Sequence, residues 1–220
     1  MKRPVVLCIF AHPDDETFGP SGTIHKLTKT HDVYIVCATR GDAGENHSKS
    51  DTRTLGEIRE EELRKSAAFL GVKKVFMLDY KDGHLSNAIY HTIAADIEKI
   101  ARKIEATTFI TFDITGLSGH IDHIAMALIA TYVFEKMKSV KTLKYYCMSE
   151  THRKALKKYF IYAPPGRKEH EIDEVINIDD VWDKKMEAIK IHKSQAKDGR
   201  RMIKRLSSLP KKEYFRILSQ

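Results

Sequence analysis

A run of six apolar residues near the start of the chain, VVLCIF at Val5–Phe10, constrains the fold more than any other feature. A continuous apolar run of this length, rich in β-branched residues, is typical of a strand that is buried on both faces at the centre of a parallel sheet. The next residues, AHPDDETFGPSGT at Ala11–Thr23, include a histidine and three consecutive acids. We therefore expect a central strand whose carboxyl end carries ionisable side chains.

Further strand-like segments alternate with helix-like segments along the first two-thirds of the chain. The expected strands are Val5–Phe10, Val33–Thr39, Val75–Leu78, Thr108–Phe112 and Leu143–Met148. Apolar residues at spacings of three and four indicate helices between these strands. This alternation predicts an α/β fold, a Rossmann-like three-layer sandwich with a mainly parallel sheet in the order 3-2-1-4-5.

After Met148 the pattern is less regular. We predict a single domain over residues 1–220, with a Rossmann-like core at 1–150 and a C-terminal helical extension at 151–220. Within the extension, EVINI at residues 174–178 suggests a late strand, followed by a helix that ends near Ala196. Beyond Gly199 we expect one or two short helices, with Pro210 marking the break.

The formal net charge of +8 is concentrated in one segment, Lys184–Arg216, which has 12 Lys and Arg residues against three acids and a local charge of +9. A basic segment suits nucleic acid, a membrane surface or an anionic substrate, but helices with one solvated basic face are common. The charge alone therefore decides nothing. The longest apolar run is too short to span a bilayer, and the start of the chain lacks a signal-peptide pattern. We expect no transmembrane segment and a cytoplasmic protein.

A second dense polar cluster, GHIDH at Gly119–His123, follows the fourth expected strand. In a sheet of order 3-2-1-4-5, strands one and four are neighbours, and ligands bind in the crevice at their carboxyl ends. Taken alone, each cluster can be explained as a helix start, because Pro13 with its acids suits a helix N-terminus and His120 suits a polar turn. Their joint position favours one shared cleft.

The residue types in the two clusters match those of a catalytic zinc site, which uses three protein ligands and leaves one position open. We predict that His12, Asp15 and His123 bind Zn2+. A histidine and an aspartate three residues apart on a strand-to-helix turn can converge on one ion, and the distant histidine completes the set.

Three ionisable residues of these clusters are then left for catalysis. Asp14 is predicted to act as the general base toward a water molecule activated by the metal. His120 is predicted to donate a hydrogen bond to a developing oxyanion or a proton to a leaving nitrogen. Asp122 is predicted to orient one of its neighbouring imidazoles. Together these residues indicate metal-assisted hydrolysis of an amide or ester.

The combination of HPDDE after the first strand and HxDH after the fourth resembles the zinc-dependent N-deacetylases that act on N-acetylglucosamine derivatives, the PIG-L or LmbE-like deacetylases. Weaker similarities to this family are found in TRGDAGE at 39–45, REEELRKSAAFLG at 59–71 with an R-x-x-E pattern, DGHL at 82–85, and HKSQ at 192–195 with an H-x-S-Q pattern. The resemblance implies the same zinc ligands, base and oxyanion residue, and it implies that Arg53 and Asp82 bind substrate. Two positions depart from the family pattern: Ser21 replaces a glycine and Ile121 a proline.

We therefore expect a zinc-dependent hydrolase that removes the N-acetyl group from an N-acetylglucosamine-containing small molecule, a homo-oligomer as in the family, with no nucleic-acid partner. The basic segment would suit an anionic group on the substrate, such as malate or a phosphate. One alternative is an amidase of thiol conjugates that uses the same zinc site. Another is a non-catalytic Rossmann-type module that binds nucleotide or nucleic acid, although neither G-x-G-x-x-G after the first strand nor G-x-x-x-x-G-K-[ST] is present.

Overall fold

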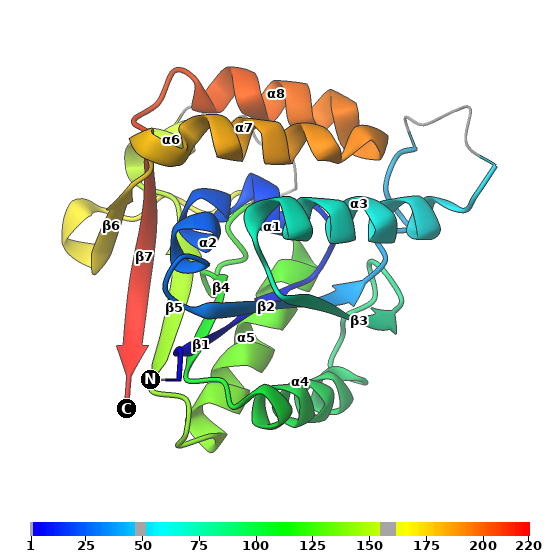
Figure 1. Ribbon diagram of the computed structural model, residues 1–220, viewed down its shortest axis with the longest axis vertical. Helices are drawn as coiled ribbons and strands as arrows, with labels where there is room; N and C mark the ends of the chain where they lie inside the picture. Colours follow the sequence, from blue (N-terminus) through cyan, green and yellow to red (C-terminus); the bar gives the residue numbers. More distant parts are fainter. Residues whose placement is uncertain (1, 47–51, 155–161) are drawn as a thin grey trace.

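Seven strands form one sheet in the order β3-β2-β1-β4-β5-β7-β6 in the computed structural model, which describes residues 2–46, 52–154 and 162–220 (Figure 1). The strands are β1 Val5–Phe10, β2 Asp32–Thr39, β3 Lys74–Tyr80, β4 Thr108–Phe112, β5 Thr142–Cys147, β6 Glu174–Asn177 and β7 Lys212–Ser219. Strands β1 to β5 are parallel, and β7 and β6 are added antiparallel at the β5 edge. The predicted order 3-2-1-4-5 is confirmed.

Helices cover both faces of this sheet and make the predicted three layers. The helices are α1 Asp15–Phe18, α2 Ser21–Leu27, α3 Leu55–Leu70, α4 Tyr90–Ile104, α5 Ile121–Lys136, α6 Glu150–Lys154, α7 Trp182–Ile191 and α8 Ala196–Leu206. Helices α4 and α5 pack on one face, and α2, α3 and α7 pack on the other (Figure 1). Helix α8 lies on the outer side of α7, away from the sheet (Figure 1). None of the helices described combines the length and the apolar composition needed to cross a membrane.

Strand β1 is the centre of the core, as its apolar run predicts. Val5, Leu7 and Ile9 face the α4/α5 layer, whereas the alternate residues face the α2/α3/α7 layer. All six residues are buried. Because β1 pairs with β2 on one side and β4 on the other, the segment that follows Phe10 emerges at the middle of the carboxyl edge of the sheet.

The C-terminal segment departs from the prediction of short helices beyond Gly199. Helix α8 continues through Gly199, and after Pro210 the chain forms strand β7, which pairs with β5. Without β7, strand β5 would leave a row of backbone N–H and C=O groups unpaired at the sheet edge. Alternate residues of β7, Glu213 and Phe215, are buried toward the core. The late strand expected at 174–178 is confirmed as β6.

A buried ion pair ties this C-terminal part to the segment that follows HPDDE. The Nζ of Lys185 on α7 lies 2.7 Å from Oε1 of Glu213 on β7, and it also donates to the carbonyl of Gly19. The Glu213 carboxylate accepts the backbone N–H groups of Gly22 and Thr23 at 3.0 and 2.7 Å, in the first turn of α2. The pair therefore fixes α2 and the preceding turn against α7 and β7.

Replacing Lys185 with Met is expected to lower the free energy of unfolding by about 3–5 kcal/mol, because it leaves the Glu213 carboxylate buried without its cation. Urea unfolding followed by circular dichroism at pH 7 measures this change. The control is Lys190→Met, which removes an exposed partner of Glu187 and should have a much smaller effect. Equal losses in the two variants would contradict this account of Lys185.

Candidate active site

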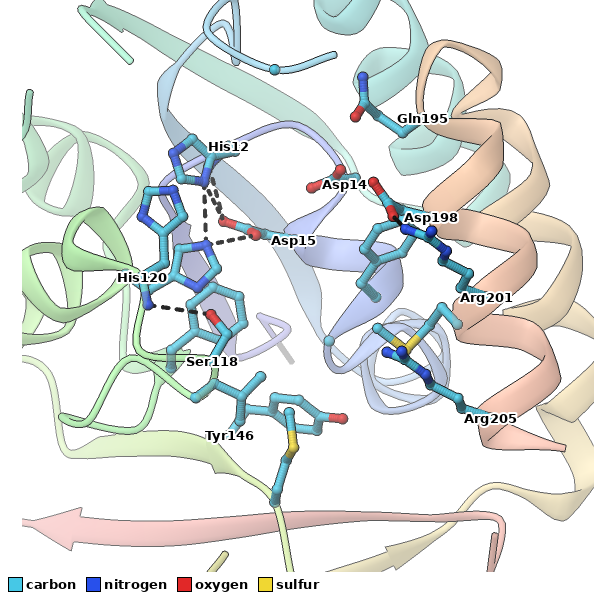
Figure 2. Close-up of a pocket in the computed structure, with 18 of the residues that line it drawn as sticks. His12, Asp14, Asp15, Ser118, His120, Tyr146, Gln195, Asp198, Arg201 and Arg205 are labelled. Carbon is cyan, nitrogen blue, oxygen red and sulfur yellow. Dashed lines mark hydrogen bonds and ion pairs between the residues drawn. The ribbon is translucent and has the colours of Figure 1, made fainter. Parts of the chain in front are cut away.

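A cavity of about 480 Å³ lies at the carboxyl ends of β1 and β4 (Figure 2). Both polar clusters of the sequence line it, with His12, Asp14 and Asp15 from the turn after β1 and His120 and His123 from the start of α5. The structure therefore brings together the two segments that the sequence places more than a hundred residues apart, at the switch point of the sheet.

Three donor atoms of His12, Asp15 and His123 converge at one point of this cavity. The Nδ1 of His12 lies 3.2 Å from Nε2 of His123, which lies 3.2 Å from Oδ1 of Asp15. The distance from His12 Nδ1 to the other Asp15 oxygen is 3.8 Å. Atoms that bind one tetrahedral zinc ion at about 2.0–2.1 Å lie about 3.3 Å apart. The three side chains therefore fit a divalent metal, as the sequence predicted.

The orientation of His12 is set by two carboxylates behind its ring. Its Nε2 lies 3.0 Å from Oδ1 of Asp82 and 3.3 Å from Oδ2 of Asp122, so this nitrogen carries a proton and Nδ1 is the nitrogen that faces the cluster, where a metal can bind it. Asp122 was expected to orient a neighbouring imidazole, His120 or His123, and instead it lies against His12. Asp82 was expected to bind substrate, and it lines the cavity beside the same ring.

The charge around His12 favours a cation at this point. Burial alone would lower the pKa of His12, but the hydrogen bonds to Asp122 and Asp82 and the nearby charge of Asp15 outweigh burial and raise it to about 10. A proton is therefore held among three carboxylates when no metal is bound. A divalent cation at the same point replaces that proton and neutralises the same carboxylates.

The other two donors are oriented by backbone groups. The Nδ1 of His123 lies 3.3 Å from the carbonyl oxygen of Gly116, which accepts its proton and leaves Nε2 with a lone pair toward the cluster. The Asp15 carboxylate accepts the N–H groups of Ala11 and His12 at 3.1 and 2.9 Å. Burial opposes ionisation of Asp15, yet His123 and His12 hold its pKa below the usual range. Asp15 and the Nε2 of His123 are thus in the form that binds metal, and His12 reaches that form when the cation displaces its extra proton.

Asp14 has an uncommon backbone conformation for a residue other than glycine, with φ of 105°. Its backbone N–H donates to Oε2 of Glu16 at 3.0 Å, while Nη2 of Arg59 donates to the carbonyl of Pro13 and to Oδ2 of Asp14 at 3.1 Å. These contacts hold the strained residue with its carboxylate lining the cavity. Burial raises the pKa of Asp14 to about 6, against the opposing effect of Arg59, which suits a general base.

Arg59 lines the cavity and contacts Asp14, and the sequence did not predict a role for it. It is buried, and its Nη1 donates to the carbonyl of Gly41 at 2.6 Å. Gly41 has a φ of +69°, and a Cβ there would lie 2.5 Å from the guanidinium carbon. The signal was the R-x-x-E pattern, of which Arg59 is the first residue. Arg53, expected to bind substrate, instead pairs with Glu61 at the surface and is not among the residues that line the cavity.

Residues of the two weaker family patterns, R-x-x-E at 59–62 and H-x-S-Q at 192–195, contact one another in the structure. Ser194 donates its backbone N–H and its hydroxyl to Glu62 at 2.8 and 2.6 Å. His192, which is fully buried, lies 2.7 Å from Oε1 of Glu16 through its Nε2. The other oxygen of Glu16 accepts the N–H of Asp14. The residues of these two patterns therefore belong to a buried hydrogen-bond network that holds the backbone of Asp14, the predicted base.

Replacing His192 with Gln is expected to lower kcat for the proposed reaction about 10- to 100-fold, because Glu16 loses its buried partner and holds the Asp14 peptide less firmly. KM and metal content per chain should stay near those of the parent protein. The control, His25→Gln, changes a histidine whose Nδ1 lies near the carbonyl of Leu70, outside the cavity lining. Loss of metal, or equal losses of kcat in both variants, would contradict the positioning role of His192.

His120 caps the N-terminus of α5 and faces the cavity through its other nitrogen. Its Nδ1 accepts the backbone N–H of Asp122 at 3.1 Å, so the proton of the neutral ring lies on Nε2. Burial and the nearby imidazoles of His12 and His123 lower the pKa of His120 to about 4. The residue is therefore suited to donate a neutral N–H hydrogen bond to an oxyanion.

The two departures from the family pattern do not alter this cavity. Ser21 is buried, and its hydroxyl donates to the carbonyl of Thr17 at 3.1 Å. Ile121 is 74% exposed. Neither residue is among those that line the cavity. The replacements therefore leave the donor atoms and Asp14 in place.

Comparisons with known proteins agree with this site. Residues 7–134 match the family model described as PIG-L: GlcNAc-PI de-N-acetylase. The probable N-acetyl-alpha-D-glucosaminyl L-malate deacetylase 2 of Bacillus cereus is 30% identical over 86% of this chain and 83% of its own. The diacetylchitobiose deacetylase of Thermococcus kodakarensis is 31% identical over 86% and 69%. The structure of N,N'-diacetylchitobiose deacetylase from Pyrococcus horikoshii superposes with a TM-score of 0.75 at 25% identity, covering 99% of this chain and 84% of that one. The chain belongs to the PIG-L family.

Proposed function

We propose that this protein is a zinc-dependent N-deacetylase that hydrolyses the acetamide of an N-acetylglucosamine-containing small molecule. The observation that carries the proposal is the convergence of His12, Asp15 and His123 on one point beside Asp14 and His120 in a single cavity. Membership of the PIG-L family, whose relatives are named as deacetylases of such sugars, supports the substrate class. The donor set of two imidazoles and one carboxylate supports zinc as the metal.

Each reacting group has a candidate residue in this site. His12, Asp15 and His123 would hold the zinc ion, which would supply a Lewis acid for the acetyl carbonyl and a lowered pKa for the attacking water. The Asp14 carboxylate takes the proton of the attacking water. The Nε2–H of His120 donates to the carbonyl oxygen as negative charge develops there. Protonated Asp14 then gives its proton to the leaving amine, so that acetate and the amino sugar are released.

The test is release of primary amine from N-acetylglucosamine conjugates by the zinc-loaded protein. We expect amine to appear with the parent protein and to be reduced to background after dialysis against a chelator, with recovery when zinc is added back. No amine from any conjugate would contradict the proposal. Faster release from a bulky N-acyl group than from N-acetyl would instead indicate the amidase of thiol conjugates.

A further inference from the structure

We propose that the active-site cavity continues into an anion subsite formed by Arg201 and Arg205 of α8. We infer from it that the group attached to the sugar of the substrate carries a carboxylate or a phosphate. This inference rests on the proposed function, because it assumes that the acetamide lies at the metal cluster. Of the 12 Lys and Arg residues in the segment Lys184–Arg216, it assigns anion binding to two.

One face of α8 forms a wall of the cavity. The residues of this face that line it are Asp198, Arg201, Met202, Arg205 and Leu206, and Leu209 follows just beyond the helix. Their spacings of three and four are those of a single helical face. Asp198, Arg201 and Arg205 lie across the cavity from His12 and His120 (Figure 2). The cavity therefore runs from the side chains of His12, Asp15 and His123 to α8.

The basic residues of α8 divide into two sets. Arg201 and Arg205 line the cavity, whereas Lys197, Arg200 and Lys204 do not; of the two lining residues, Arg205 is half-buried and Arg201 is exposed. Helices with a basic face are common at protein surfaces, and the second set is such a face. The first set differs because its side chains share a wall with apolar residues in a concave site.

The charge of Arg205 is not balanced by an acid within the described ranges. Arg201 has a partner on its own helix, since its Nη1 lies 3.2 Å from Oδ1 of Asp198. Among residues 2–46, 52–154 and 162–220, no carboxylate forms an ion pair with Arg205, which is only partly exposed. A guanidinium in a partly desolvated wall binds a carboxylate or phosphate well, because its N–H groups match the two oxygens.

The two ends of the cavity differ in net charge: Arg59 lies with three aspartates at the end with the metal donors, whereas Asp198 lies with Arg201 and Arg205 at the α8 end. Asp14, Asp15 and Asp82 line the end that holds the metal donors, so an anionic group is repelled from the part of that end not covered by the metal. Arg201 and Arg205 line the other end. An acidic conjugate is thereby oriented with its acetamide toward the metal donors and its anionic group toward α8. A volume of about 480 Å³ falls within the range of small-molecule sites, roughly 300–1,000 Å³.

Three matched N-acetylglucosaminides test the subsite: one with a carboxylate on the attached group, one with a phosphate there, and one with a neutral carboxamide. Their dissociation constants are measured by calorimetry on zinc-loaded Asp14→Asn protein, and kcat/KM is measured on the parent protein. At least one anionic conjugate is expected to bind about 10- to 100-fold more tightly than the carboxamide, the effect of one or two charged hydrogen bonds. Preference for the carboxylate or for the phosphate identifies the anion.

Variants of α8 separate a specific contact from a general charge effect. Arg205→Met keeps much of the side-chain volume, and it is expected to weaken binding of the preferred anionic conjugate about tenfold while leaving the carboxamide unchanged. Arg201→Met/Arg205→Met should abolish the preference. Lys204→Met removes one charge from the outer face of the same helix. It should change the affinity for neither the anionic conjugate nor the carboxamide.

Two results would overturn the subsite. One is equal affinity of the parent site for the carboxamide and both anionic conjugates, and the other is an equal loss for charged and neutral conjugates in Arg205→Met. Failure of the proposed function gives a different pattern, in which no amine is released from any conjugate. In that case the calorimetric comparison still tests whether the anion subsite exists, because it measures binding and does not require turnover.

Discussion

Asp14→Asn protein is expected to lose kcat by a factor of about 10²–10⁴ while it keeps its metal, because the amide cannot accept the proton of the attacking water. The substitution leaves the donor atoms of His12, Asp15 and His123 intact. Asparagine also tolerates a positive φ better than most residues, so the backbone conformation at 105° is retained. Amine release gives kcat, and plasma mass spectrometry gives the metal content of the same sample.

The matched control for this variant is Asp198→Asn, which removes a carboxylate from the opposite wall of the same cavity. It lies on α8, where it pairs with Arg201, and it is expected to retain most of the parent kcat. If Asp14→Asn turned over substrate at the parent rate, the assignment of the base would be wrong. If both variants failed equally, the loss would reflect the charge of the cavity and not the position of Asp14.

His123→Ala protein is expected to lose both bound metal and turnover. Removing its Nε2 leaves the Nδ1 of His12 and the carboxylate of Asp15, and two donors bind zinc far more weakly than three. The parent protein should contain about one zinc ion per chain, and the variant should contain almost none after gel filtration. A histidine that lines the cavity without joining the cluster, His152, supplies the control variant His152→Ala.

The two large effects test different parts of the proposal. Asp14→Asn separates metal binding from turnover, whereas His123→Ala removes both together. A His123→Ala protein that retained one zinc ion per chain would place the metal elsewhere. The second group of candidate ligands, His12, His120 and Asp122, would then be the site to examine.

The central part of the fold follows from the sequence because its signals are local. VVLCIF predicts a doubly buried strand, and β1 is buried on both faces. The alternation of strands and helices predicts the parallel order that β1 to β5 adopt. Strand β7 was not predicted, because what stabilises it is the open edge of β5, which no local pattern in residues 212–219 records.

In the site, too, local sequence signals predicted some residues, whereas contacts between distant residues could not be predicted. HPDDE and HIDH predict His12, Asp15 and His123 as metal ligands by residue type and by their position after adjacent strands, and the structure brings these three side chains together. The partners of those donors could not be named. Asp122 lies against His12, across the cleft, because the hydrogen bonds that it accepts from Gly83 and Leu85 fix its carboxylate there.

By itself the sequence determined the central strand, the order of the parallel sheet and the three side chains that converge in the cavity, since each depends on periodicity or on residues within one short turn. Only the tertiary structure decided that Arg59 and the His192–Glu16 pair hold Asp14. It also decided which two arginines of the basic segment face the cavity. The contacts that hold Asp14 join residues 45 and 176 positions apart, and such contacts exist only once the helices have packed on the sheet.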